Sequence, residues 1–413
     1  MIKEKRITLK NLGHLNPESI DDYINAGGYD VWKKVVFRDH LKIIDEMLSS
    51  SLRGRGGAGF SAGLKKKFTS ESCLRCEQKY VICNADEGEP GTFKDRIIME
   101  NDPHLLIEGM LIAAYAIGAD KAFIYIRGEY HKSIRMLEKA IESARKKEFI
   151  GKNVFGSGFN IDVEIKLGAG SYLCGEELTM LESLEGKRGY PRIKPPFPAE
   201  KGLFGYPTLI NNVETLATVP DIVGKGADWY CTLGTDDSPG TKIFTISGDV
   251  VKPGFYEVEM GVSLRQLIYD LAGGMKDGKE FYAAILGGAA GTFVDESILD
   301  TPMGYDTLKE KGAVLGSGAI MVMAKGRSLF DMAYSILEFF KHESCGKCVP
   351  CRIGLPQLLL IMDKVKNKKI DRKEALDLLL HESEFMANSS LCPLGQSPIL
   401  PIKSLKQFFE NQF

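Results

Sequence analysis

The chain has 413 residues, 44% of them hydrophobic and 26% charged, which is ordinary for a globular protein large enough for two or three domains. Its net charge of −2 excludes a strongly basic surface built for nucleic acid. No run of roughly 18 apolar residues could span a membrane, and no apolar run follows the basic N-terminus as it would in a signal peptide. We expect a cytoplasmic protein without nucleic-acid partners and without direct membrane insertion.

The first 240 residues alternate between apolar runs typical of strands and periodic stretches typical of helices. Residues 1–50 predict short helices with a turn near Gly27, and a glycine-rich loop within 52–68 then leads into a basic helix. Further elements are expected at 79–85 (strand), 104–119 (helix), 121–130 (strand), 131–147 (helix) and 162–189 (strand, glycine-rich turn and helix). The proline-rich stretch 190–212 is expected to be an extended loop. This alternation predicts an α/β layer with a mainly parallel sheet.

The sequence pattern changes near residue 240. Residues 242–274 predict a hairpin followed by a helix, and 281–288 and 319–325 predict further strands of a small β-grasp-like module. From about residue 328 onward the chain is expected to be helical. We therefore expect three domains, with boundaries at 1–240, 241–327 and 328–413.

Four cysteines near the C-terminal end form the strongest motif. Cys345, Cys348 and Cys351 follow the spacing C-x2-C-x2-C, and Cys392 lies farther along the chain. This pattern can ligate a [4Fe–4S] cluster or a zinc ion, or it can consist of buried apolar thiols. Zinc sites more often use two C-x2-C pairs, so three cysteines in one run favour the cluster, and the proline at 393 is a further resemblance to ferredoxins. Nine cysteines, an odd number in a large chain, argue against a secreted disulfide scaffold.

Four loops carry candidate ligand groups. The glycine-rich loop 54–60 lacks a Walker pattern, and it is either a backbone cradle for a phosphate or a flexible turn. The acidic loop 84–96 suits hydroxyl recognition or a divalent metal, with a solvated acidic face as the alternative. Residues 168–177 place glycines before a helix with two glutamates in its first turn, and 210–215 offer two adjacent amides. Nearby aromatic residues serve either as core or as stacking platforms: Phe60, Phe68, Phe197 and Phe204.

Six motifs in register closely resemble one family. They are "GRGGAGFSAGLKKKF", "NADEGEPGTFKDR", "GAGSYLCGEE", "EGKRGYPRIKPPFPAEKGL", "INNVET" and "ESCGKCVPCRIG…LCPLG". The family is the NADH-binding flavoprotein subunit of respiratory complex I, with its relatives in NAD-dependent [FeFe]-hydrogenases and formate dehydrogenases. The resemblance covers about residues 20–400, and it implies a Rossmann-like FMN/NADH α/β domain, a ubiquitin-like domain and a C-terminal helical bundle that carries the cluster.

The resemblance also implies the residues that hold each cofactor. FMN is expected to be held by Gly54, Arg55, Gly57, Lys65, Asn84, Asp86, Gly175, Glu176, Asn211, Asn212 and Thr215. NADH is expected to be held by Phe60, Phe68, Glu87, Glu89, Glu177, Lys194 and Phe197, with Glu87 and Glu89 positioning it. The cluster is expected on Cys345, Cys348, Cys351 and Cys392, and no side chain needs to act as a general base.

The implied activity is that of a diaphorase: hydride transfer between NADH and FMN, followed by single-electron transfer to the cluster. The implied partners are a thioredoxin-fold [2Fe–2S] subunit and a larger iron–sulfur or hydrogenase catalytic subunit. The parent complex stays open, because "LCPLGQSP" resembles the hydrogenases and Glu89 resembles complex I. The alternative function is a non-catalytic scaffold with a structural zinc. The extra pair Cys73 and Cys76 is interpreted as idle surface thiols, with a zinc or redox pair as the alternative.

Overall fold

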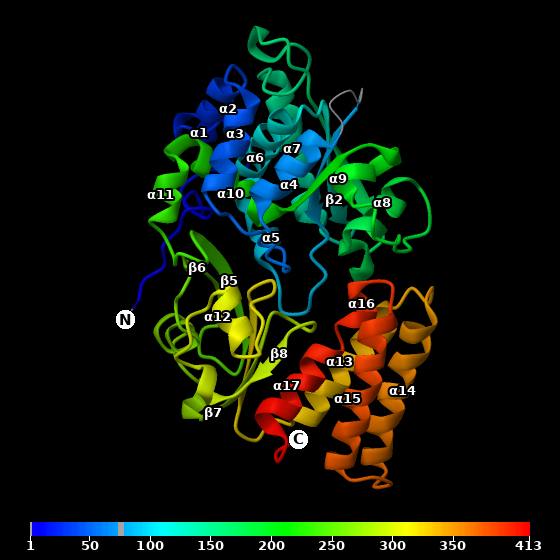
Figure 1. Cartoon of the computed structure of the whole chain (residues 1–413). Coiled ribbons are helices and arrows are strands. Elements are labelled where there is room, and N and C mark those ends of the chain that lie inside the picture. Colours follow the sequence, from blue (N-terminus) through cyan, green and yellow to red (C-terminus); the bar gives the residue numbers. More distant parts are fainter. Residues whose placement is uncertain (1, 73–77) are drawn as a thin grey trace.

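The computed structural model describes residues 2–72 and 78–413, so Cys73 and Cys76 lie outside the described residues. An α/β region forms the upper part of the molecule in Figure 1. A region built on a second sheet and a bundle of helices lie below it, next to each other. The mixed α/β fold with C-terminal helices is the predicted fold class.

The α/β region is a four-stranded sheet flanked by helices. Its strands are β1 (Tyr80–Ala85), β2 (Lys121–Arg127), β3 (Asp162–Gly168) and β4 (Thr208–Asn212). They are all parallel in the order β3-β2-β1-β4. The helices of this region are α1 (Ile20–Asn25), α2 (Asp30–Val35), α3 (His40–Ser49), α4 (Ala62–Glu71), α5 (Lys94–Asn101), α6 (Pro103–Ile117), α7 (His131–Lys146), α8 (Glu177–Leu184), α9 (Pro198–Lys201), α10 (Val213–Lys225) and α11 (Ala227–Cys231).

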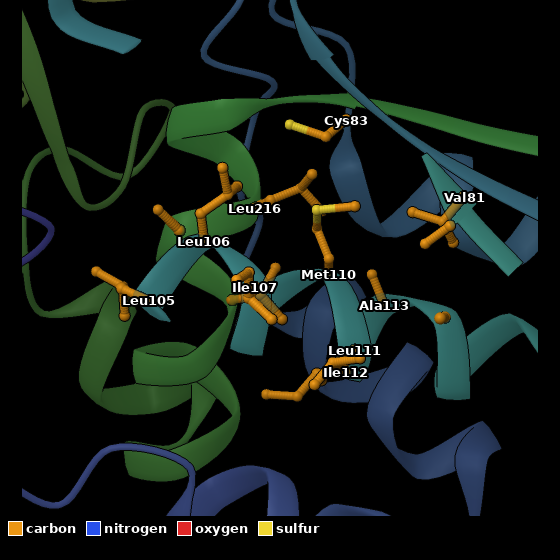
Figure 2. Packing of buried hydrophobic residues seen from close by; sticks show 14 of the residues in the cluster. Val81, Cys83, Leu105, Leu106, Ile107, Met110, Leu111, Ile112, Ala113 and Leu216 are labelled. Atoms are coloured by element: carbon orange, nitrogen blue, oxygen red, sulfur yellow. The ribbon is translucent and has the colours of Figure 1, made fainter. Parts of the chain in front are cut away.

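Side-chain alternation along β1 gives the sheet two different faces. Val81 and Cys83 point into the main core, whereas Ile82 points into a smaller core under α8. Figure 2 shows the main core, where Met110 of α6 and Leu216 of α10 lie among the buried side chains. Because both faces of the sheet are covered, the sequence of β1 is a continuous apolar run rather than an alternation of apolar and polar residues.

Helix α6 shows how local sequence fixes an element of this core. Asp102 caps its N-terminus by accepting from Leu105 N at 3.3 Å, and Pro103 occupies the first turn. Gly118, with φ of +73°, ends it in the left-handed conformation that glycine tolerates best. A Cβ on Gly109 would lie 1.9 Å from the carbonyl oxygen of Leu216, so this glycine allows α6 and α10 to pack closely.

The second sheet has the order β6-β5-β9-β7-β8. The predicted hairpin is β5 (Thr241–Gly248) with β6 (Gly254–Glu259), and the predicted later strands are β7 (Phe281–Leu286) and β9 (Ala319–Ala324). Strand β9 pairs in parallel with β5, which is the one parallel pairing of this sheet within the described residues. The remaining elements are a π-helix (Gln266–Leu271), two 3-10 helices (Lys276–Gly278 and Glu296–Ile298), β8 (Thr292–Val294) and α12 (Tyr305–Glu310).

The C-terminal region consists of helices, as predicted. They are α13 (Leu329–Glu343), α14 (Val349–Lys366), α15 (Arg372–Ser389), α16 (Pro393–Gln396) and α17 (Ile399–Phe409). Their apolar faces share one core with β7, β8 and Leu173 of the α/β region. No helix in the described part of the chain combines the length and hydrophobicity needed to cross a membrane.

Two predictions about elements of the α/β region were wrong. The stretch 190–212 is not an extended loop throughout, because it contains α9 and ends in β4, a strand of the parallel sheet. The prolines predicted a loop, but they all lie before the strand. None of them therefore removes an N–H group from its hydrogen-bond ladder. The strand expected at 121–130 ends at Arg127, where the chain turns into α7.

Candidate functional site

The site lies where β1 and β4 end side by side. Asn84 of β1 is in register with Asn212 of β4. The chain leaves β1 towards β2 on one side, while β4 lies on the other side. Open parallel sheets bind ligands at such a switch point, beyond the carboxyl ends of the strands. The fold therefore brings the acidic loop and the amide pair together, although more than a hundred residues separate them in the sequence.

The glycine-rich loop is anchored to the start of α10. Arg55 N donates to Thr215 Oγ1 at 2.8 Å, and a Cβ on Gly56 would lie 3.0 Å from Asn212 Cβ. The side chain of Asn212 caps α10 by accepting from Glu214 N at 3.0 Å. Backbone N–H groups of a glycine loop beside a helix N-terminus form an environment that favours anions.

The guanidinium of Arg55 does not face this loop. It is 1% exposed, and its Nη2 donates to Tyr230 Oη at 2.9 Å and to the Pro239 carbonyl oxygen at 2.8 Å. Tyr305 of α12 also supports the loop by donating to the Gly54 carbonyl oxygen at 2.9 Å. The second sheet region therefore helps to hold the glycine loop in shape.

Asp86 is the most unusual group of the site. It is 8% exposed, and neither carboxylate oxygen has a hydrogen-bond partner among the described residues. Burial raises its pKa to about 7, although Arg127 opposes the shift. Next to it, Asn84 Nδ2 donates to the Gly175 carbonyl oxygen at 2.9 Å. A buried carboxylate without donors needs a ligand that brings them.

These features fit FMN. The carboxylate of Asp86 can accept hydrogen bonds from the hydroxyl groups of a ribityl chain, and the glycine loop can accept the phosphate. The backbone of Gly175 lies beside Asp86, since a Cβ there would lie 3.4 Å from the Asp86 carbonyl oxygen and 3.9 Å from its carboxylate Oδ2.

The two glutamates expected to position NADH already have partners within the chain. Glu87 caps α5, because its Oε1 accepts from Asp95 N at 2.8 Å and its Oε2 accepts from Arg96 N at 3.1 Å. Glu89 accepts from Tyr172 Oη at 2.6 Å and from Ala290 N at 3.0 Å. Burial raises the pKa of Glu87 to about 7 and also raises that of Glu89. Glu89 thus joins the acidic loop to the turn after β7.

Two further glutamates neutralise the lysines of the site. Glu176 caps α8 by accepting from Leu178 N at 2.9 Å, and its other oxygen accepts from Lys194 Nζ at 2.8 Å. Glu177 forms an ion pair with Lys65. Neither lysine is left as a free charge for an incoming anion.

Four aromatic side chains around these loops are exposed to solvent rather than packed in the core. Their exposed fractions are 45% for Phe60, 49% for Phe68, 53% for Phe197 and 56% for Phe204. Phenylalanine is usually buried, so the core interpretation of these residues does not hold. They are available to stack on a planar ring.

A buried charge network behind the site was missed by the sequence analysis. Lys94 pairs with Asp95 at 2.7 Å and with Glu214 at 2.9 Å, and Lys242 Nζ lies 3.4 Å from Glu214. Burial by itself would raise the pKa of Glu214, but Lys242, Lys94 and Arg55 lower it. Charged residues are mostly exposed, so no local sequence signal distinguishes these from surface residues.

The four predicted cluster cysteines meet at the ends of three helices. Cys345 and Cys348 lie between α13 and α14, Cys351 lies in the first turn of α14, and Cys392 precedes α16. Cys351 and Cys392 are buried, and the other two are half-buried. Burial and the neighbouring Cys348 and Cys345 raise the pKa of Cys351 to about 11. Within residues 2–72 and 78–413, no three His, Cys, Asp or Glu side chains are arranged to hold a single metal ion.

The thiols share an apolar cluster with the segment that leads to Glu176. Leu173 packs in the same apolar cluster as Cys351 and Cys392, and Tyr172 N donates to Glu343 Oε2 at 2.9 Å. Four thiols are a ligand set for a [4Fe–4S] cluster and also for a structural zinc ion. The cysteines therefore fit a cluster placed next to the loop that also carries Gly175.

Comparison with protein families matches most of the chain. Residues 47–221 match a family model described as "Nuo51 FMN-binding domain", and residues 331–413 match "NADH-ubiquinone oxidoreductase-F iron-sulfur binding region". Residues 243–289 match "SLBB domain". Each of these three segments lies within one of the three expected domains.

Similar proteins extend over the whole chain. The "NADP-reducing hydrogenase subunit HndC" of Solidesulfovibrio fructosivorans is 44% identical over 100% of this chain and 83% of its own length. An NADH-quinone oxidoreductase subunit of Rhizobium meliloti (strain 1021) is 44% identical over 98% of this chain and 96% of its own.

This chain belongs to the family of NADH-binding flavoprotein subunits. A solved NAD+-reducing [NiFe]-hydrogenase in the H2-reduced state has a similar chain, with a TM-score of 0.85 and 37% identity over 99% of the present chain. The present chain spans 66% of that hydrogenase chain. The flavoprotein subunit therefore has an FMN-binding domain, a [4Fe–4S] region and NADH as its substrate, and it is part of a multi-subunit complex I-like or hydrogenase assembly.

Proposed function

We propose that this flavoprotein subunit admits electrons from NADH at the carboxyl ends of β1 and β4 and delivers them to a cluster on Cys345, Cys348, Cys351 and Cys392. When bound, FMN supplies the exchange between the two electrons of NADH and the single electrons of the cluster. The observation that carries the proposal is the position of residues 172–176: Gly175 accepts a hydrogen bond from Asn84, and Leu173 packs in the same apolar cluster as Cys351 and Cys392.

The chain's own residues position and shield the cofactors. Asp86 and Asn84 would face the ribityl chain, Gly54 to Gly57 with Thr215 would face the phosphate, and Phe60, Phe68 and Phe197 would stack on NADH. Glu87 and Glu89 fix the acidic loop through their contacts with α5 and with the turn after β7. The proposed domain boundaries at 240 and 327 fall shortly after the ends of α11 and β9.

The proposed partners are those that the family resemblance implies. An electron that reaches the helical region needs an acceptor outside this subunit. We propose a thioredoxin-fold [2Fe–2S] subunit beside the α/β region and a larger iron–sulfur or hydrogenase catalytic subunit beside the helices. The seven described cysteines are free thiols, which supports a reducing location such as the cytoplasm.

The test is an anaerobic absorbance titration of the full chain with NADH, with flavin, iron and zinc assayed in the same sample. We expect bleaching of both flavin and iron–sulfur bands. In Cys348→Ala we expect the cluster bands to be lost while NADH still bleaches the flavin. Zinc in place of iron, or no flavin, would contradict the proposal and favour the scaffold function. Equal loss of flavin reduction in Cys348→Ala, with FMN still bound, would contradict the order of the two transfers.

A further inference from the structure

Lys66 of α4 is a buried cation with almost no partner. Its side chain is 0% exposed. Among the described residues its Nζ has one acceptor, Asn211 Oδ1 at 3.5 Å, which is the long end of hydrogen-bond distance. An ammonium group has three donors, so most of its hydrogen-bonding capacity is unused.

Other lysines that are as deeply buried have carboxylate partners. Lys94 pairs with Asp95 and Glu214, and Lys242 pairs with Glu214. Within the described chain Lys66 forms no ion pair, and its one electrostatic neighbour of note is another cation, Lys65. Burial and this neighbour lower the pKa of Lys66 to about 7. A buried charge without a counter-ion is costly, which suggests that a ligand supplies the counter-ion.

The surroundings of Lys66 identify the kind of counter-ion. Its acceptor Asn211 is adjacent to Asn212, the residue that caps α10 beside the glycine loop. The other two cations near this loop are engaged elsewhere in the chain. Lys65 is paired with Glu177. The terminal nitrogens of Arg55 donate to Tyr230, Pro239 and Arg53, although its Nε has no partner among the described residues. The helix N-terminus and one uncompensated ammonium together suit a phosphate monoester.

We propose that Lys66 binds the phosphate group of FMN and supplies the positive charge that the rest of the site lacks. This inference rests on the proposed function, because it takes FMN as the ligand of the glycine loop. It adds a residue to those implied by the family motifs, in which Lys65 is the lysine assigned to FMN. An ion pair with the phosphate would keep Lys66 charged in the bound state.

The test compares FMN with riboflavin, which lacks the phosphate. The full-length chain is freed of flavin, and binding of each flavin is followed by quenching of flavin fluorescence. For Lys66→Met we expect the Kd for FMN to rise roughly 10- to 100-fold, as for loss of a charge-assisted hydrogen bond. The Kd for riboflavin should stay within about twofold. Lys66→Arg should recover much of the FMN affinity, because it keeps the charge.

The matched control is Lys67→Met, at the next position of α4. The Lys67 side chain is 46% exposed and lies 3.9 Å from Glu71. Its removal should change neither Kd by more than about twofold, since an exposed pair contributes little. Unchanged FMN affinity in Lys66→Met, or equal weakening of FMN and riboflavin, would overturn the inference.

Thermal unfolding gives a second readout that does not depend on activity. Flavin-free Lys66→Met should have a higher Tm than the unaltered chain, because an uncompensated buried charge is removed. FMN should then raise its Tm by less than it raises that of the unaltered chain. A lower Tm, or failure to fold, would show that Lys66 serves the fold and would overturn the inference. If the unaltered chain bound neither flavin, the proposed function itself would fail.

Discussion

The substitution Asp86→Asn tests two effects of this carboxylate separately: how much it lowers the stability of the flavin-free chain, and how much it strengthens flavin binding. The pKa of Asp86 rises from 3.8 to about 7 because the carboxyl is buried. A raised pKa means that the folded state binds the proton more tightly than the unfolded state. The stability gained from this proton is fully present below about pH 4 and is lost as the pH rises through 7.

The loss of stability caused by ionised Asp86 can be calculated from the rise in its pKa. Each pK unit corresponds to about 1.4 kcal/mol, so ionised Asp86 lowers the free energy of unfolding of the flavin-free chain by about 4 kcal/mol at pH 8. At pH 5 the corresponding loss is about 2 kcal/mol. Asparagine does not titrate. The stability advantage of Asp86→Asn over the unaltered chain should therefore grow by about 2–3 kcal/mol between pH 5 and pH 8.

Whereas Asp86→Asn should stabilise the flavin-free chain, it should weaken flavin binding. The ionised carboxylate accepts hydroxyl hydrogen bonds more strongly than an amide does, so Asp86→Asn should weaken FMN binding roughly 10- to 100-fold. Urea unfolding of flavin-free protein at pH 5 and pH 8, together with flavin fluorescence titration, measures both effects. Asp45→Asn, at an exposed position of α3, is the control. If stability differed equally at both pH values, or if FMN affinity were unchanged, our explanation of the orphaned carboxylate would be refuted.

Two further predictions concern groups around this site. Glu89→Gln should raise the KM for NADH about tenfold with FMN content unchanged, because the amide is uncharged and can accept from only one of the two donors that Glu89 now accepts from, Tyr172 and Ala290. An unchanged KM in steady-state kinetics, with flavin content assayed in the same samples, would contradict this. Glu214→Gln should lower the free energy of unfolding by about 3–5 kcal/mol, since it leaves Lys94 and Lys242 buried without their shared partner. The exposed control Asp306→Asn should cost less than about 1 kcal/mol in urea unfolding, and equal effects of the two substitutions would argue against a stabilising role for the buried network.

Part of the site could be predicted because it depends on short stretches of sequence. The spacing of Cys345, Cys348 and Cys351 places them at one helix start, and Glu176 before α8 is a helix cap. The exposure of Phe60 and Phe197 could not be predicted, because it depends on which surfaces other elements cover. The strand β4 was not predicted for a related reason: a short buried edge strand that follows several prolines and a short apolar run in a loop look alike in sequence.

By itself, the sequence determined the family, the α/β-to-helical order of the chain and the four thiols, because these follow from motifs and periodicities within a few tens of residues. The tertiary structure alone decided which charges are compensated. Among the described residues Asp86 has no donor and Lys66 has no carboxylate partner, and both side chains are buried in the packed structure. Burial and pairing are properties of contacts between distant segments, so no local pattern distinguishes Lys66 from its exposed neighbour Lys67.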